Sequence, residues 1–589
     1  MGNTMPTSLV DADLILALDI GTTTTRAILF DVVEGRYRFL GAGTTPTTAN
    51  APVSDISDGV RLALDQLEDI TGRRLTGPDG QLAIPALPDG TGVDACVATL
   101  SVGLPIRVVA IGLLEHISAE SARNLATTTY AEVLETLSLN DKRLTATRLD
   151  TLLSLRPDLV VIAGGAEGGA SESVINLLEA VGLACYVLPK EQRPEVLYAG
   201  NSALAHQVKE TLGGLASLHI APNVRPSLDI EQLTPSQPVL SQVFRQVRAR
   251  QMRGVAEIDH WASNHLTPTA AAFGRTIRFI SKEYAHTNKG VLGIDVGASS
   301  TTIAAGYAGD LILSIYTQLG LGQNLPQMLQ LCEIEDIQRW LSVEIPNDEL
   351  LDYIHNKSAF PGTLPAGPTE LAIEQALACQ AATLAIRQAM QAYPPQLPRP
   401  FPDFLPSFEP IIATGRSFTR APLRSQALLM LLNALQPTGI TTLALDRNNL
   451  AAVLGAAAEV APLLTVQSLD STNFLNLCTV ISPVGRAPFG APILRLRLAT
   501  DDQQEVKLEV KHGTLEVIKL PPGQSGTLYL TPLHRFDVGL GGPGRGGTLK
   551  VVGGALGVVI DARGRPLRFS ADPGRRRDMH RKWQAIFDA

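Results

Sequence analysis

The chain has 589 residues, of which 45% are hydrophobic and 18% are charged. This length is too great for one hydrophobic core, and at roughly 150 residues per domain it predicts about three to four compact units. The formal net charge of −8 argues against a general nucleic-acid-binding protein, which needs a basic surface.

Cysteine usage and hydropathy narrow the class of protein further. The five cysteines are scattered, and no two stand at metal-ligand spacing, which is typical of free thiols in a reducing compartment. No apolar run approaches the ~18 residues of a membrane span, and the start of the chain lacks the pattern of a signal peptide. We therefore expect a cytoplasmic protein with neither a membrane nor a nucleic acid as its partner.

The first predicted element is a three-stranded meander, from strand patterns at 13–20, 26–33 and 36–43. A helix with acidic residues near its start follows over 54–72. DACVATLSVG (94–103) then predicts a buried strand.

Residues 106–220 alternate strand and helix patterns, which predicts parallel strands covered by helices. The strands are expected at RVVAIG, LVVIAGG, CYVLPK and VLYAGN. Residues 241–260 predict a charged, exposed helix.

The strand–turn–strand pattern of the chain's start returns from residue 290, and helix 372–390 follows it. The proline-rich segment 393–410 predicts an extended connector. Strand 411–415 ends in a glycine, and 450–460 predicts a helix of small residues.

The composition changes after about residue 463, where short strands are separated by turns. This pattern predicts a small β-barrel or β-sandwich. Asp572 followed by Pro573 predicts the start of a last helix, because proline is favoured at the first helical position.

Two similar loops are the main evidence for function: LALDIGTTTTRAILFDV (17–33) and GVLGIDVGASSTTIAAGY (290–307). In each, an aspartate, Asp19 or Asp295, ends an apolar strand and stands two residues before a glycine, Gly21 or Gly297. The glycine permits close backbone approach, and exposed amides with added hydroxyl groups can hold phosphate oxygens. A single loop of this kind is as well explained by an ordinary polar hairpin, but the duplication favours a ligand site.

The pair of loops predicts a specific chemistry. Two facing turns could clasp a polyphosphate between two lobes, and each aspartate could hold a hydrated Mg²⁺ through its carboxylate. One of the two aspartates could instead orient an attacking water.

The repeated loops resemble those of the actin, Hsp70 and sugar-kinase ATPase superfamily. Three further segments fit this resemblance: LTPTAAAFG (266–274) and LAAVLGAAAEV (450–460) are similar to its connecting helices, and IIATGRSFTRAP (411–422) to its adenosine loop. The resemblance implies an α/β fold with two actin-like, ribonuclease-H-like lobes. It places Gly415 and Arg416 beside the nucleotide, and Arg26 where these proteins carry a phosphate-binding lysine.

A narrower resemblance covers residues 13–462. RPDLVVIAGGAEGGASESVINLLEAVG (156–182), followed by VLYAGN, NVRPSLDIEQLTP and TPTAAAFGR, is similar to the MutL/GlmL family associated with glutamate mutase, which is not the mismatch-repair family. The resemblance implies a slow Mg-dependent ATPase that serves as a reactivating chaperone for an adenosylcobalamin-dependent mutase. The mutase is therefore the expected protein partner, and ATP and Mg²⁺ are the expected cofactors.

The expected domain division combines these patterns. A tail (1–12) precedes ATPase lobe I, which is followed by an α/β insertion, lobe II and a β-rich C-terminal domain. The boundaries are 13–111 with 262–289 for lobe I, 112–261 for the insertion, 290–462 for lobe II, and 463–589 for the C-terminal domain.

The predicted site draws on both loops and the adenosine loop. Asp19 and Asp295 are the predicted catalytic residues and metal ligands. The predicted nucleotide-binding residues are Gly21, Thr22, Thr23, Thr24, Arg26, Gly297, Ala298, Ser299, Ser300, Gly415 and Arg416.

Two other functions fit the same cleft. A small-metabolite kinase would need a base beside the acceptor, for which the sequence shows no clear candidate. An ATP-switched scaffold or actin-like protein would polymerise, which the insertion and the C-terminal region disfavour.

Overall fold

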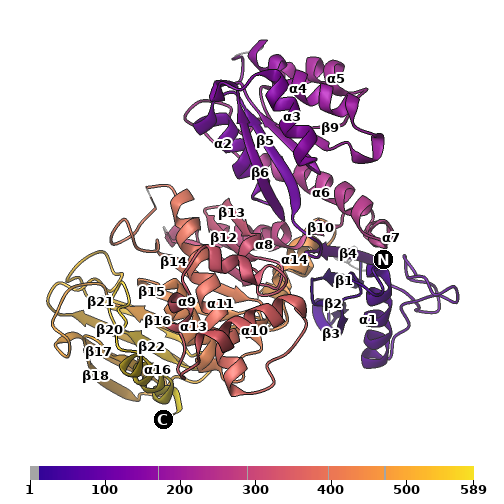
Figure 1. Cartoon of the computed structure of the whole chain (residues 1–589). Helices are drawn as coiled ribbons and strands as arrows, with labels where there is room; N and C mark the ends of the chain where they lie inside the picture. Colours follow the sequence, from indigo (N-terminus) through magenta and orange to yellow (C-terminus); the bar gives the residue numbers. More distant parts are fainter. Residues whose placement is uncertain (1–11, 170–171, 288, 396, 470–472, 589) are drawn as a thin grey trace, which may run out of the picture. The chain divides into compact units, whose positions relative to one another are not determined.

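The computed structural model describes residues 12–169, 172–287, 289–395, 397–469 and 473–588 (Figure 1). The chain divides into two compact units. Unit 1 comprises Met1–Ala272, Ser314–Thr317 and Ala456–Pro462, and unit 2 comprises Phe273–Leu313, Gln318–Gly455 and Leu463–Ala589. Each unit contains two sheets.

The first sheet of unit 1 is built on the predicted meander, which is confirmed: β1 (Leu14–Ile20), β2 (Thr24–Val33) and β3 (Arg36–Pro46) pair antiparallel. β4 (Ala95–Leu100) pairs parallel to β1, and the short β10 (Thr267–Pro268) extends the sheet, giving the order β10-β4-β1-β2-β3. Helix α1 (Ile56–Thr71) packs on this sheet. It begins where the Asp55 carboxylate accepts a 3.0 Å hydrogen bond from the Ser57 amide, and it ends at Gly72 in the left-handed conformation.

The second sheet of unit 1 is parallel throughout, as predicted, in the order β6-β5-β7-β8-β9. Successive side chains of a strand point to opposite faces. Val161 therefore joins the core formed with α2 (Glu120–Ala126) and α6 (Gln237–Gln251), whereas Val160 and Ile162 join the core formed with α3 (Thr145–Leu155), α4 (Glu172–Val187) and α5 (Ala205–Leu212). Figure 1 shows α2 on one side of this sheet, and α3 and α4 on the other. The strands are β5 (Ile106–Gly112), β6 (Ala131–Ser138), β7 (Leu159–Ala163), β8 (Glu195–Tyr198) and β9 (Ser217–Ile220).

Three predictions for this region differ from the structure. CYVLPK is not a strand, because Cys185 and Ala184 continue the buried face of α4. The sheet instead gains β6 and β9, neither of which was predicted. The segment 241–260 is not an exposed helix, since Val243, Phe244 and Val247 of α6 are buried, and a second helix, α7 (Val255–Trp261), follows a break at Gly254. The boundary expected at residue 111 falls inside β5, which pairs with β6 and β7.

The main sheet of unit 2 repeats the plan of the first sheet. β11 (Gly290–Val296), β12 (Thr301–Tyr307) and β13 (Asp310–Tyr316) follow one another as adjacent strands, and β14 (Phe408–Thr414) and β15 (Gly439–Leu445) extend the sheet parallel to β11. Their order, β13-β12-β11-β14-β15, matches β3-β2-β1-β4-β10 strand for strand. The chain thus has the duplicated ribonuclease-H-like lobes of an actin-like ATPase fold, which confirms the predicted fold class.

Helices cover both faces of the lobe II sheet. α11 (Pro368–Ala389) packs against β12 and against α13 (Arg424–Leu435). The two predicted connecting helices correspond to α8 (Thr269–Glu283) and α14 (Ala451–Ala457). These two helices contact each other directly. The Thr276 hydroxyl donates to the Ala451 carbonyl at 2.7 Å, an approach that small side chains permit.

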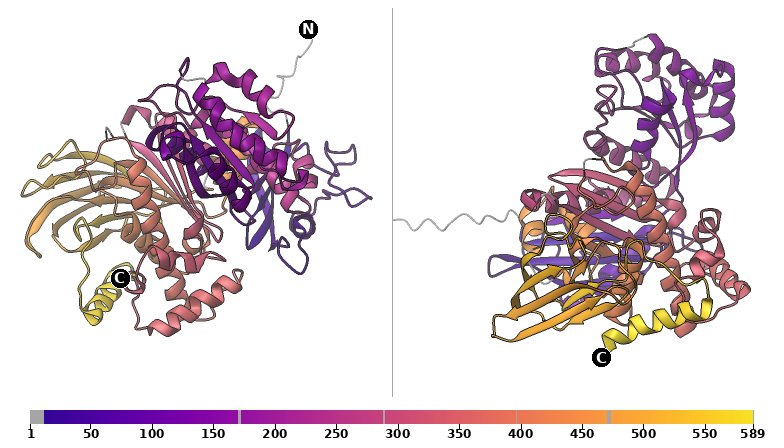
Figure 2. Two further views of the ribbon diagram at one scale, coloured as in Figure 1. Left: turned by 45° about the horizontal axis from the view of Figure 1, so that its top comes forward. Right: turned by 90° about the vertical axis from the view of Figure 1, so that its left-hand side faces the viewer.

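The C-terminal region extends lobe II (Figure 2). β16 (Leu475–Ser482), β22 (Val558–Asp561) and β19 (Leu515–Ile518) continue the main sheet beyond β15, whereas β17 (Pro492–Thr500), β18 (Glu505–Lys511), β20 (Ser525–Pro532) and β21 (Gly547–Val552) form a separate antiparallel sheet. One buried cluster joins the two sheets, with Ile481 and Ile560 on one side and Leu496 and Leu530 on the other. The result is a sandwich, one of the two predicted alternatives, but three of its strands belong to the lobe II sheet.

The last helix, α16 (Pro573–Asp588), begins as predicted, because the Asp572 carboxylate accepts a 2.7 Å hydrogen bond from the Arg575 amide. His580 anchors it to unit 2 through a 2.8 Å contact between Nε2 and the Arg339 carbonyl. Within the described residues, no helix combines the length and the apolar character needed to cross a membrane.

Candidate nucleotide site

The loop of lobe I is a tight turn between β1 and β2. The Gly21 amide donates to the Thr24 carbonyl at 2.9 Å, and Asp19 lies opposite Arg26 in the strand register. A Cβ atom on Gly21 would lie 3.0 Å from that carbonyl oxygen, which is closer than side chains ordinarily pack. The close contact favours glycine at this position, and the turn brings together Asp19, Gly21, Thr22, Thr23, Thr24 and Arg26.

Asp19 is held in surroundings that disfavour its charge. It is half-buried at the end of β1, and the Thr99 hydroxyl donates to its Oδ1 at 2.9 Å. Burial raises the pKa of the Asp19 carboxyl, and this effect outweighs the charge of Arg26 and the Thr99 hydrogen bond, which both lower it. A cation beside Asp19 would offset the cost of charging this buried carboxyl group.

The threonines of this loop keep donors available. The Oγ1 atoms of Thr22 and Thr25 are buried, and neither has a hydrogen-bond partner among the described residues. A buried hydroxyl without a partner costs roughly 1–3 kcal/mol of folding free energy. Thr25 is fully buried and its hydroxyl faces Gly59 of α1, so of the two only the Thr22 hydroxyl, at the turn itself, suits the predicted phosphate ligand.

The loop of lobe II has the same geometry. The Gly297 amide donates to the Ser300 carbonyl at 2.9 Å, and Asp295 lies opposite Thr302, the position equivalent to Arg26. The turn also packs closely on the next loop, since a Cβ atom on Gly320 would lie 2.5 Å from the Ala298 carbonyl oxygen. This turn groups Asp295 and Gly297 with Ala298, Ser299 and Ser300.

Gly415 connects the predicted adenosine loop to the same strand ends. Its φ is +97°, and a Cβ atom there would lie 2.3 Å from the Val296 carbonyl oxygen. Only glycine fits such a position. Arg416 follows it and is exposed, so lobe II brings Gly415 and Arg416 to the end of β11.

Sequence reasoning missed Thr99 and Thr414. Thr99 pairs with Asp19 across β1 and β4, and Thr414 pairs with Asp295 across β11 and β14. Both threonines follow an alanine at the end of the fourth strand, in VATL and IIAT. This repeated Ala-Thr pair was a usable signal, but only after the fourth strands had been aligned.

Two residues after β15 were also missed. Asp446 is fully buried, and its two carboxylate oxygens accept hydrogen bonds from the amides of Leu450 and Ala451 at 2.8 and 2.7 Å. Asn449 accepts a 3.0 Å hydrogen bond from the Thr414 hydroxyl. The start of α14 is thus tied to the end of β14.

The predicted Mg²⁺ ion does not need a cluster of protein ligands. In the part of the chain that the structure describes, no group of three or more His, Cys, Asp or Glu side chains could hold a metal ion. Mg²⁺ usually keeps several waters and takes one or two carboxylates plus phosphate oxygens. Asp19 in unit 1 and Asp295 in unit 2 suit that role, and their joint use remains a prediction.

The glycine-rich turn after β7 has a structural explanation. A Cβ atom on Gly200 would lie 2.4 Å from the Gly164 carbonyl oxygen, so two backbone segments meet here. Glu167 accepts a 2.8 Å hydrogen bond from Asn223 Nδ2. Close packing thus accounts for Gly164, and the Glu167 carboxylate is held within the turn by Asn223.

Comparison with known proteins gives one family and several distant folds. The model of the MutL protein family matches residues 15–472. Protein MutL of Clostridium tetanomorphum is 24% identical over 297 residues, a match that covers 49% of this chain and 57% of the relative. The chain therefore spans little more than half the length of this curated relative.

The similar solved structures are more distant. An ATP-dependent caprolactamase from Pseudomonas jessenii is 13% identical, with a TM-score of 0.31 over 84% of this chain and 81% of its own. A diol dehydratase-reactivating factor is 11% identical, with a TM-score of 0.28 over 76% of this chain and 99% of its own. These likenesses are too weak to carry a functional argument.

Proposed function

The chain belongs to the MutL protein family, and from this premise we propose that it binds Mg·ATP with its two repeated loops and hydrolyses it slowly. The repeated geometry carries the proposal. Each loop has an aspartate at the end of the first strand, the same 2.9 Å glycine hydrogen bond, and a threonine opposite the aspartate on the fourth strand. A single polar hairpin has no reason to be repeated in this detail.

Each group has a role in this proposal. The amides and hydroxyls of the two turns bind the phosphates, Arg26 adds positive charge, and Gly415 lets the backbone approach the adenosine. Asp19 and Asp295 hold the hydrated Mg²⁺ and orient the attacking water. ATP that contacts both loops stabilises the closed state, in which the two loops meet. Hydrolysis removes that stabilisation. Only such a difference in ATP affinity between the two states can drive a conformational change.

We further propose that this cycle serves an adenosylcobalamin-dependent mutase, and that the protein reactivates this partner. Support comes from family membership. The partner test is a pull-down from native cells in the presence of ATP and then of ADP. Recovery of a B12 enzyme in a nucleotide-dependent manner supports the proposal, and its absence under both conditions contradicts it.

The nucleotide site is tested with Asp19→Asn and Asp295→Asn. Mutating a residue that only hydrogen-bonds to a metal ligand typically costs roughly 10–100-fold in metal affinity or activity. Because Asp19 and Asp295 are proposed to be the ligands themselves, we expect each substitution to lower Mg-dependent ATP turnover by at least ~100-fold. Asp31→Asn is the matched control, because Asp31 lies on β2, the strand next to that of Asp19, but pairs with Arg73. It should leave turnover unchanged.

Normal turnover in both site variants would contradict the assignment. ATP turnover that appears only when a metabolite is added would instead favour the kinase function. Both outcomes are read from the same phosphate-release assay.

A further inference from the structure

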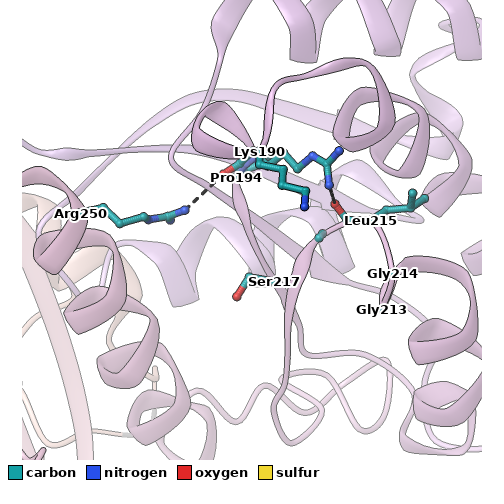
Figure 3. Close-up of a pocket in the computed structure, with 9 residues that line it drawn as sticks. Lys190, Pro194, Gly213, Gly214, Leu215, Ser217 and Arg250 are labelled. Carbon is teal, nitrogen blue, oxygen red and sulfur yellow. Dashed lines mark hydrogen bonds between the residues drawn. The ribbon is translucent and has the colours of Figure 1, made fainter.

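A basic pocket lies at the edge of the parallel sheet of unit 1 where β8 and β9 begin (Figure 3). Its volume is about 240 Å³. Lys190, Arg193 and Arg250 line it, together with the turn 213–216 and Ser217. Figure 3 shows Arg250 reaching in from α6 and Lys190 from another segment, with Ser217 between them and the turn. The surplus of cations is unexpected in a chain whose net charge is −8.

Arg193 is fixed by backbone carbonyls. Its Nε donates to the Leu188 carbonyl and its Nη1 to the Leu215 carbonyl, each at 3.1 Å. These bonds join the end of α4 to the turn before β9, so the guanidinium is held at the pocket wall. No carboxylate within the described residues pairs with it.

Arg250 is paired with a buried carboxylate. Its Nη2 lies 2.8 Å from Glu195 Oε1, and His219 Nε2 lies 2.7 Å from the other oxygen of Glu195. Burial alone would raise the pKa of Glu195, but hydrogen bonds from His219 and Ser217 and the charge of Arg250 outweigh burial and lower it. The negative charge of Glu195 is thereby neutralised within the pocket wall.

Lys190 is, besides Arg193, the pocket cation that has no carboxylate partner among the described residues. Its ammonium group makes no ion pair or hydrogen bond to the described part of the chain, and its side chain is exposed. The C-terminal ends of α4, α5 and α6 lie nearby and carry about half a negative charge each, which offsets part of the positive potential. We therefore expect binding of modest affinity that centres on Lys190.

The pocket is built for binding rather than for nucleophilic catalysis. Ser217 Oγ lies 3.5 Å from His219 Nε2, the same nitrogen that contacts Glu195. A catalytic triad needs the serine and the acid on different ring nitrogens. Ser217 thus has no activating base, and its hydroxyl is already hydrogen-bonded to Glu195.

We propose that this pocket binds a phosphate group, either as free inorganic phosphate or as part of a small phosphomonoester. A tetrahedral phosphate accepts hydrogen bonds from several directions, and the Lys190 ammonium and the N–H groups that Arg193 does not use for its two backbone carbonyls are the donors on offer. The pocket is smaller than the roughly 300–1,000 Å³ typical of drug-sized ligands, which suits a single anionic group. The proposal is independent of the nucleotide site, which lies on another sheet.

Gly214 provides a matched pair of variants. It lines the pocket, its φ is ordinary, and a Cβ atom there would meet nothing within 4 Å. Gly214→Asp adds a carboxylate at the pocket, and Gly214→Asn adds the same shape without charge. Phosphate and glycerol 3-phosphate are titrated by calorimetry at constant ionic strength, with Mg·ADP present to fill the nucleotide site.

We expect Gly214→Asp to weaken phosphate binding at least ~10-fold by charge repulsion, while Gly214→Asn stays within about 3-fold of the wild type. Lys190→Gln should also weaken binding ~10-fold. Lys142→Gln, at the opposite edge of the sheet after β6, should have no effect. Binding of only one of the two ligands identifies the form of phosphate that the pocket takes.

Two results would overturn the proposal: no binding of either ligand to the wild type, or equal binding in all variants. Failure of the proposed nucleotide site looks different. Asp19→Asn would then leave ADP binding unchanged, whereas Gly214→Asp reports only on the basic pocket.

Discussion

The carboxyl group of Asp19 is placed where its proposed role as a Mg²⁺ ligand and the stability of the fold have opposite requirements. Phosphate chemistry with Mg²⁺ needs a charged carboxylate, but burial at the end of β1 disfavours that charge. Thr99 and Arg26 compensate only in part. Strain of this kind is expected at a site that completes its interactions with a ligand.

This conflict predicts a pH-dependent gain in stability for Asp19→Asn without nucleotide. The raised pKa means that the folded state holds the proton more tightly than the unfolded chain, whose aspartates have the ordinary value of 3.8. Below that value both states are protonated, and as the pH rises through it the folded wild type loses stability. We expect the variant to unfold at a higher temperature than the wild type at pH 7, and the difference to disappear near pH 3 to 4.

Thermal unfolding at a series of pH values measures this effect. Mg·ATP should then stabilise the wild type and not the variant. A variant that is less stable than the wild type at neutral pH would show that the Arg26 pairing outweighs burial.

At the scale of elements, the start of α14 joins the end of β15 to the end of β14. Asp446 caps the helix with both carboxylate oxygens, and Asn449 bonds Thr414 beside the lobe II loop. The helix predicted over 450–460 is shorter in the structure, Ala451–Ala457, and ends before Pro462. The capping loop therefore positions a short helix of small residues.

Asp446→Ala should lower the free energy of unfolding by about 1–2 kcal/mol, the usual cost of losing an N-cap. Asp446→Asn keeps one acceptor oxygen and should cost less. Urea denaturation measures both. A cost for Asp446→Ala no greater than for Asp446→Asn would show that the cap contributes little.

At the scale of the whole molecule, the C-terminal region completes lobe II. β16 pairs antiparallel with β15 along the full length of β15, from Gly439 to Leu445. Buried Asp561 on β22 pairs with Arg563 and Arg565, and the Arg563 guanidinium lies 4.4 Å from the ring centre of Trp583 on α16. Sheet, charge cluster and last helix thus form one structure with lobe II.

Deletion of residues 463–589 should therefore prevent folding of unit 2, because it exposes the edge of β15 and opens the core around Ile440 and Ile481. Deletion of 573–589 removes only α16 and should leave a folded but less stable protein. Solubility and far-ultraviolet circular dichroism separate the two variants. A soluble, cooperatively folding 1–462 fragment would contradict this account.

The sequence by itself determined the features that are local. Strand and helix periodicity, the turns at Gly21 and Gly297, and the cap at Asp572 depend on neighbouring residues. The meanders, the last helix and the strands β5, β7 and β8 of the parallel sheet were therefore predicted correctly. The duplicated loop identified both lobes, because the same residues recur at the same places. The family resemblance over most of the chain was confirmed.

Only the tertiary structure decided which distant segments pair. Thr99 is 80 residues from Asp19, yet parallel pairing of β1 and β4 brings its hydroxyl to the carboxylate. Long-range pairing also made β5 part of the parallel sheet and β16 part of lobe II. A strand pairs with the neighbour that allows both of its faces to be buried, and its own sequence pattern does not specify that neighbour. The basic pocket likewise unites the ends of α4, β9 and α6, whose residues are unremarkable until the chain has folded.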